Sequence, residues 1–176
     1  MKFILTSFIL LFGLTSNAQT NTPDPELDTS NVVSKFPNGF KKTVGRKGGN
    51  GPYIRYYENG QIMESGNYVN GKLDGLWTEY YIGGQTKIKI AYSNDVLNGI
   101  YEKYYENGEL KYSGEYVNGK RHGDFLRQFP NGETRETRSY INGKKDGEWT
   151  EYDEKGKIIS KVTYVCLLYT SDAADD

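Results

Sequence analysis

Glycine and aromatic residues recur along this chain with a fixed period of 24 residues. Glycine opens each unit without any insertion or deletion between units, at Gly51, Gly75, Gly99, Gly123 and Gly147. The third place of every unit is aromatic, as Tyr53, Trp77, Tyr101, Phe125 and Trp149. A fixed period of this length indicates a repeat protein, whose units bury their apolar sides only by stacking on their neighbours.

Two turn signals divide each unit into two strands. Places are counted from the opening glycine of each unit, which is place 1. The first turn signal stands at places 9 and 10, as in Asn59-Gly60, and the second at places 20 and 21, as in Asn70-Gly71. Asn-Gly between aromatic or β-branched residues favours a two-residue type I′ hairpin turn, which needs positive φ at both central residues. The sequence therefore predicts an all-β fold, an elongated antiparallel array of β-hairpins with about ten strands.

The turn positions also predict which residues share a face of the sheet. A two-residue turn at places 9 and 10 puts place 7 opposite place 12 and place 3 opposite place 16, and such partners share a face. One face should then carry the aromatic residues of places 3, 7 and 18 and the aliphatic residues of place 12. Glycines at place 16, Gly66 and Gly114, should leave room there for rings to lie over the backbone.

The other face is predicted to be polar and is the candidate binding surface. It should carry places 6 and 13, with the lysines of place 22. Its candidate binding residues are Tyr56, Tyr80, Tyr104 and Tyr152, together with Lys87, Lys111 and Arg135. Tyrosine supplies large amphipathic contact area and is enriched in interfaces. The alternative is that these rings and the lysine stems only cover one another and stiffen a single-layer sheet.

The repeated columns resemble the MORN repeat in its variant form, as found in the YwqK-type antitoxin family. Their pattern is an aromatic residue, then Tyr-Tyr-x-Asn-Gly, then Tyr-x-Asn-Gly-Lys. The five units span residues 51–74, 75–98, 99–122, 123–146 and 147–165. The second unit departs from the pattern, with Gly83-Gly84 and Asn94-Asp95 at its turns. The resemblance implies a hairpin array used for protein or membrane contacts, and it implies no reaction.

The segments outside the five units have other expected roles. Residues 34–50 contain Phe36-Pro37-Asn38-Gly39, which mirrors residues 129–132 and indicates a degenerate N-terminal repeat or cap. Residues 1–18 are typical of a secretory signal peptide, with Lys2, a short apolar run and small residues before Gln19. The apolar run is too short for a transmembrane anchor. Residues 19–33 are expected to form a flexible tether.

The last segment, residues 166–176, does not follow the repeat. It resembles the translated sequence of a sequencing adaptor and is expected to be non-native. The natural protein is then expected to continue past Val165 with further repeats or a cap. An open last strand exposes unpaired backbone groups, so self-association through it is also expected.

Composition and motifs favour a protein without enzymatic activity. The chain has 22 Lys and Arg against 23 Asp and Glu, so no large net charge attracts nucleic acid. His122 is the single histidine and stands at a polar turn place, and no nucleophile with a base, phosphate-binding loop or metal-ligand cluster is recognisable. We therefore expect no catalytic residues and no cofactor.

Three functional hypotheses remain from the sequence. The first is an exported scaffold, periplasmic, cell-surface or secreted, that binds a protein or glycan through its repeat face. The second is an antitoxin or immunity-type protein that neutralises a toxin outside the cytoplasm. The third is a passive structural spacer, which would have no partner.

Overall fold

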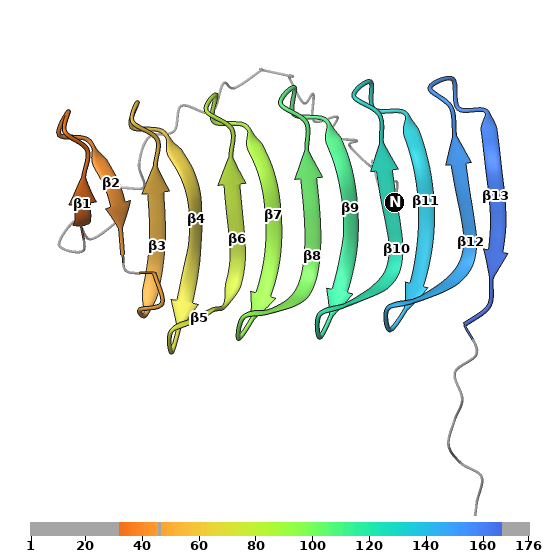
Figure 1. Cartoon of the computed structure of the whole chain (residues 1–176), viewed down its shortest axis with the longest axis horizontal. Helices are drawn as coiled ribbons and strands as arrows, with labels where there is room; N and C mark the ends of the chain where they lie inside the picture. The colour runs from red at the N-terminus through yellow and green to blue at the C-terminus, as the bar shows by residue number, and fades with distance from the viewer. Residues whose placement is uncertain (1–31, 46, 167–176) are drawn as a thin grey trace, which may run out of the picture.

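The structure is a computed structural model that describes residues 32–45 and 47–166. The predicted signal peptide, the tether up to residue 31 and residues 167–176 of the predicted non-native tail lie outside the described residues. The described chain forms one antiparallel sheet of 13 strands and contains no helix (Figure 1). It therefore contains no helix that is long and apolar enough to span a membrane.

Successive hairpins lie side by side in chain order, so the sheet grows by addition of one unit after another. A short hairpin of β1 (Val32–Lys35) and β2 (Lys41–Val44) precedes the five units. The strands of the units are β3 (Gly51–Tyr56), β4 (Ile62–Val69), β5 (Lys72–Leu73), β6 (Gly75–Tyr80), β7 (Thr86–Ser93), β8 (Val96–Tyr104), β9 (Leu110–Val117), β10 (Lys120–Gln128), β11 (Thr134–Ile141), β12 (Lys144–Tyr152) and β13 (Ile158–Tyr164). The all-β hairpin array predicted from the sequence is confirmed.

The second turn of the unit, at places 20 and 21, is the type I′ turn expected from the sequence. Asn118 and Gly119 both have positive φ, at 50° and 76°, and Asn70 and Gly71 repeat this geometry. In the second unit Asn94 and Asp95 take its place with φ of 51° and 69°, although neither is glycine. Asparagine and aspartate tolerate this left-handed conformation better than other side chains do.

The first turn of each unit, predicted at places 9 and 10, differs from the prediction, because it is a three-residue loop. Tyr57 N–H donates to the Gln61 carbonyl at 2.8 Å, and Gly60 N–H donates to the Tyr57 carbonyl at 3.0 Å. Only Gly60 has positive φ, at 85°, whereas Asn59 does not. This is a type I turn followed by a left-handed glycine. The Asn59 Oδ1 accepts from the Gln61 N–H at 3.0 Å, which fixes the loop locally.

A β-bulge follows this loop and shifts the strand pairing by one residue. Arg55 pairs with Glu64, but the next residue, Tyr56, pairs with Ile62, so Met63 is the extra residue. Place 3 therefore lies opposite place 16 as predicted, whereas place 12 lies opposite place 6 instead of place 7. The prediction that place 12 shares the aromatic face is wrong, because the bulge moves place 12 to the other face and place 13 onto the aromatic one.

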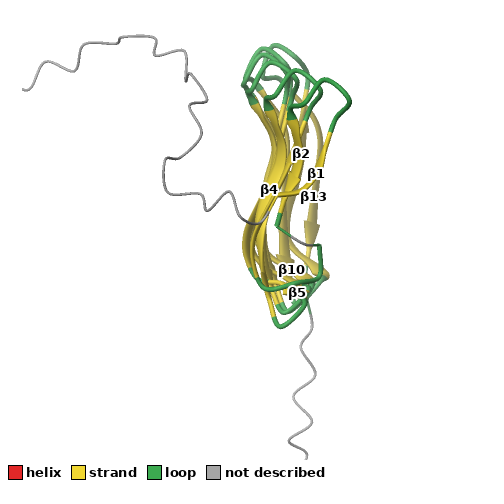
Figure 2. Cartoon of the chain, turned by 90° about the vertical axis from the view of Figure 1, so that its left-hand side faces the viewer, coloured by secondary structure: helices red, strands yellow, loops and turns green. Residues whose placement is uncertain are grey.

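We call the ring face the face of the sheet that carries the third-place aromatics, Tyr53, Trp77, Tyr101, Phe125 and Trp149. The other face is called the opposite face. The sheet is a single layer, as the edge-on view shows (Figure 2). With no second layer to cover it, the sheet buries side chains by packing them along both faces: Phe125 and Tyr140 on the ring face are only 3% and 5% exposed, and Thr150 on the opposite face only 2%.

Gly66 and Gly114 have the role predicted for them on this face. A Cβ atom on Gly66 would collide with the Trp77 ring, and one on Gly114 would collide with the Phe125 ring. Neither glycine has positive φ, so the close approach of the ring is the reason for glycine at these positions.

The hairpin that precedes the units repeats their first loop. Phe36 N–H donates to the Phe40 carbonyl and Gly39 N–H to the Phe36 carbonyl, both at 2.9 Å. Phe129 and Gly132 make the same two bonds in the fourth unit. The sequence likeness of these two segments thus corresponds to the same backbone geometry.

Candidate binding site

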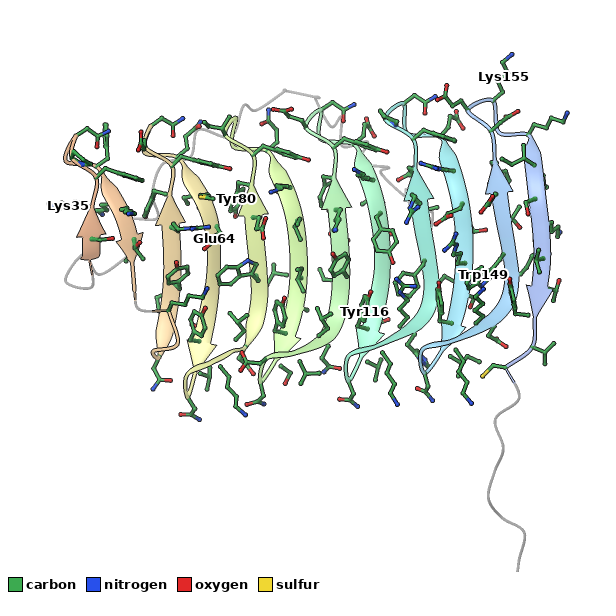
Figure 3. All side chains as sticks on the ribbon, viewed as in Figure 1. Lys35, Glu64, Tyr80, Tyr116, Trp149 and Lys155 are labelled. Carbon is green, nitrogen blue, oxygen red and sulfur yellow. The ribbon has the colours of Figure 1, made fainter. Side chains whose placement is uncertain are left out.

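Aromatic rings form a nearly continuous row along the ring face. Trp77 is stacked on Tyr53 with ring centroids 5.7 Å apart and planes 15° apart. From Tyr101 to Tyr164 each ring meets the next at centroid distances between 4.7 and 5.7 Å. Figure 3 shows this row at the level of Tyr116 and Trp149. In the second unit, places 14 and 16 hold the aliphatic Ile88 and Ile90, whereas the third unit has Tyr112 and Gly114 at the same places.

Tyrosines at place 7 connect each hairpin to the next. The Tyr57 hydroxyl donates to the Tyr80 carbonyl at 2.8 Å, and the Tyr81 hydroxyl donates to the Tyr104 carbonyl at 2.9 Å. The Tyr105 hydroxyl donates to the Gln128 carbonyl at 2.9 Å. These bonds stabilise the stacking of neighbouring units near their first loops.

The seven candidate binding residues from the sequence do not form one surface. Tyr56 and its equivalents Tyr80, Tyr104 and Tyr152 lie on the opposite face. Lys87, Lys111 and Arg135 lie on the ring face, because they occupy the bulged place 13. There Lys111 Nζ lies 5.1 Å from the centre of the Tyr105 ring, and Arg135 Cζ lies 5.7 Å from that of Phe129.

The place-6 tyrosines are also less exposed than expected. Tyr56 is buried, with 8% of its surface exposed, and the other three are half-buried. The Tyr104 hydroxyl donates to Glu102 Oε2 at 2.6 Å, and Lys89 Nζ lies 5.6 Å from the centre of its ring. Burial, together with the hydrogen bond to the Glu102 carboxylate, raises the pKa of Tyr104 to about 12. This environment is that of a packed side chain.

The ring face instead presents a groove lined by basic and tyrosine side chains, across β8 to β11. We call it the basic groove, and its volume is about 360 Å³. Its tyrosines are Tyr101, Tyr105, Tyr112 and Tyr116. Its cations are Lys103, Lys111, Arg121, Arg127 and Arg135. Among the residues that the structure describes, no acidic side chain lines it.

Only one of these cations has an acidic partner in the part of the chain that the structure describes. Arg127 Nε lies 3.4 Å from Glu136 Oε1, and Glu136 is shared with Arg138, at 2.7 Å. Within the same residues, Lys103, Lys111, Arg121 and Arg135 form no ion pair. The groove therefore has positive charge that the protein itself does not neutralise.

Arg121 is the most firmly positioned of these cations. Its Nη1 donates to the Tyr140 hydroxyl at 3.0 Å, and its guanidinium lies 5.7 Å from the Phe125 ring centre. Hydrogen bonding to the Tyr116 hydroxyl raises its pKa above an already high ordinary value. Burial raises the pKa of the neighbouring Tyr112 to about 12, although the charge of Arg121 opposes this shift.

Sequence reasoning did not find this groove. It singled out Lys111 and Arg135 but placed them beside the wrong tyrosines, and it did not select Lys103, Arg121 or Arg127. The sequence feature that could have indicated the groove is place 23, which is basic in two successive units, as Arg121 and Lys145. The type I′ turn pairs place 23 with the tyrosine at place 18, as in Arg121 and Tyr116.

The described residues contain no group of three or more His, Cys, Asp or Glu side chains that could hold a metal ion. His122 is half-buried on the opposite face, beside Glu115 across the strand pair. Its Nδ1 has no hydrogen-bond partner within the described chain. We assign it no chemical role.

Comparison with known families agrees with the repeat geometry. No curated protein was found to match the chain. Residues 50–70, 97–118 and 145–165 match the MORN repeat variant family. These segments lie largely within the first, third and fifth units, and each contains the three-residue loop of its unit with the strands on either side of it. The chain thus contains at least three segments of MORN repeat variant type, set within one hairpin array.

Proposed function

We propose that this chain is an exported, non-enzymatic repeat scaffold that binds a protein or glycan partner through its ring face. The observation that carries the proposal is the basic groove, where Lys103, Lys111, Arg121 and Arg135 have no acidic partner among the described residues and lie beside a row of tyrosine rings. Tyrosine and arginine are the side chains most often enriched where binding energy concentrates. A single-layer sheet also leaves both faces open to a partner along its length.

The match to the MORN repeat variant supports a scaffold in preference to a catalytic domain. Export is supported by the sequence pattern of residues 1–18. Mass spectrometry of the protein recovered from the envelope or medium of a bacterial host should show the loss of these 18 residues. Recovery there with Met1 retained would contradict export by a cleaved signal peptide.

The binding face is tested with two double variants of equal charge. Lys111→Ala/Arg135→Ala removes two exposed cations from the basic groove. Lys120→Ala/Lys144→Ala removes two exposed lysines from the opposite face in the same units and serves as the matched control. Capture of partners from envelope and secreted fractions should fall for the first variant and persist for the second. Equal capture by both variants would refute the assignment of the ring face.

The two alternatives from the sequence give different results in this experiment. An antitoxin should capture one defined toxin, encoded by a neighbouring gene, and a passive spacer should capture nothing above background. Neither alternative is favoured by a feature of the sheet itself, so the binding scaffold is the function that we propose.

A further inference from the structure

We propose that the basic groove binds a linear acidic polysaccharide, a glycan chain with carboxylate or sulfate groups at regular intervals. This inference rests on the function proposed above, because it names the partner class of the same face. Lys and Arg recognise both acid groups through charge-assisted hydrogen bonds. Sulfated and carboxylated chains are therefore separate arms of the test.

The charge of the groove favours an anionic ligand. Lys111 and Arg135 are exposed, and neither forms an ion pair within the described sheet. Arg121 is held by tyrosine hydroxyls and rings, which leave its charge uncompensated. The Glu136 carboxylate, which pairs with Arg127 of the groove, is buried and already shared by two arginines, so it would not repel an anion strongly.

The spacing of the cations favours a regularly charged chain. Lys111 on β9 and Arg135 on β11 occupy the same place in successive units, and one strand, β10, lies between them. Strands are about 4.8 Å apart, so equivalent cations recur at about 10 Å along the sheet. An extended polysaccharide with one acid group per disaccharide has a comparable charge repeat. Side chains on one face of an extended peptide recur at only about 7 Å.

The tyrosines supply the second element of such a site. Tyr101, Tyr112 and Tyr116 are half-buried, so part of each ring is accessible along the groove. A tyrosine ring offers an apolar face and a polar hydroxyl. A sugar ring likewise has apolar C–H faces with hydroxyl groups at its edge. Rings between regularly spaced cations are thus suited to a sugar chain that carries acids.

The test measures binding of the full chain to defined polymers by isothermal titration calorimetry. The polymers are heparin as the sulfated chain, hyaluronan as the chain with one carboxylate per disaccharide, and neutral dextran. Poly-glutamate and a single-stranded oligothymidine represent acidic peptides and nucleic acid. We expect wild type to bind heparin or hyaluronan and not dextran, and whichever of the two binds more tightly identifies the preferred acid group.

The same two double variants separate the groove from general charge attraction. Lys111→Ala/Arg135→Ala should weaken polysaccharide binding by about tenfold or more, since it removes two direct charge-assisted contacts. Lys120→Ala/Lys144→Ala, with an identical net charge, should change it by less than about twofold. Unchanged thermal melting would show that both variants fold, as expected for exposed side chains.

Three results would overturn the inference. The first is an equal loss in both variants, which would indicate non-specific attraction. The second is tighter binding of poly-glutamate or oligothymidine than of either polysaccharide. The third is no polysaccharide binding at all. If protein capture still depended on Lys111 and Arg135 in any of these cases, the binding scaffold would stand without a glycan ligand. If it did not, the proposed function would fail as well.

Discussion

The indole ring of Trp77 lies directly over Gly66, where a Cβ atom would collide with the ring. The pair is repeated two units along the sheet by Phe125 over Gly114. Each ring therefore packs against backbone of the preceding unit and links two hairpins. In a sheet with one layer, such contacts replace the packing that a second layer would supply.

Gly66→Ala should destabilise the protein by about 1–3 kcal/mol, because the ring must move to accept the methyl group. Gly114→Ala should have a similar effect through Phe125. Chemical denaturation measures both free energies of unfolding. Ser65→Ala, one residue away on the opposite face, is the control and should stay within about 0.5 kcal/mol. Equal stability of Gly66→Ala and wild type would show that the ring does not depend on the glycine.

Tyr105→Phe should cost about 1 kcal/mol, because it removes the hydrogen bond to the Gln128 carbonyl and leaves that carbonyl without its partner. Tyr152→Phe is the control, since its hydroxyl makes no hydrogen bond to the described residues. Hydrogen exchange of the Tyr105→Phe variant should show faster opening near the first loops of the third and fourth units. No difference between the two variants would argue against the connecting role of place 7.

The sheet should lose stability as pH rises from about 10 to about 12. The pKa values of Tyr104 and Tyr112 are raised from 10.0 to about 12 in the folded protein, chiefly by burial. The folded state therefore favours the neutral phenols, so their contribution is complete below pH 10 and is lost as pH approaches 12. Phenolate absorbance and circular dichroism should be followed together. The double variant Tyr104→Phe/Tyr112→Phe should show a smaller alkaline loss, and phenols that all titrate near pH 10 would contradict the prediction.

Asn118→Ala should destabilise the protein by about 1–2 kcal/mol, whereas Asn118→Gly should be nearly neutral. Asn118 has φ of 50° in the type I′ turn, and a Cβ-bearing residue without a short polar side chain disfavours this conformation. Thermal or chemical denaturation of both variants checks the prediction. Equal stability of the alanine and glycine variants would show that the turn tolerates either conformation.

The sequence was enough to predict the period, the hairpin array and the residues of the ring row. These features depend on local turn chemistry and on a spacing that never changes, so each unit repeats the same register. Gly66 and Gly114 were also predictable, because their partners across the strand pair are the third-place residues Tyr53 and Tyr101.

The first loop and the bulge could not be derived from the sequence. Asn-Gly is compatible both with a type I′ turn and with a type I turn followed by a left-handed glycine. The choice depends on the twist and pairing of the strands beyond the loop. A shift of one residue exchanges the two faces of a strand. For this reason Lys111 was assigned to the face opposite the one it occupies.

The sequence by itself determined that the protein is a repetitive β-sheet with nearly balanced charge. Only the tertiary structure decided how that charge is distributed. The bulge brings Lys111 and Arg135 to the ring face, the type I′ turn adds Arg121, and the burial of Glu136 removes the nearest acid from the surface. A net charge sums over all residues, whereas a binding groove depends on which side chains the register places together.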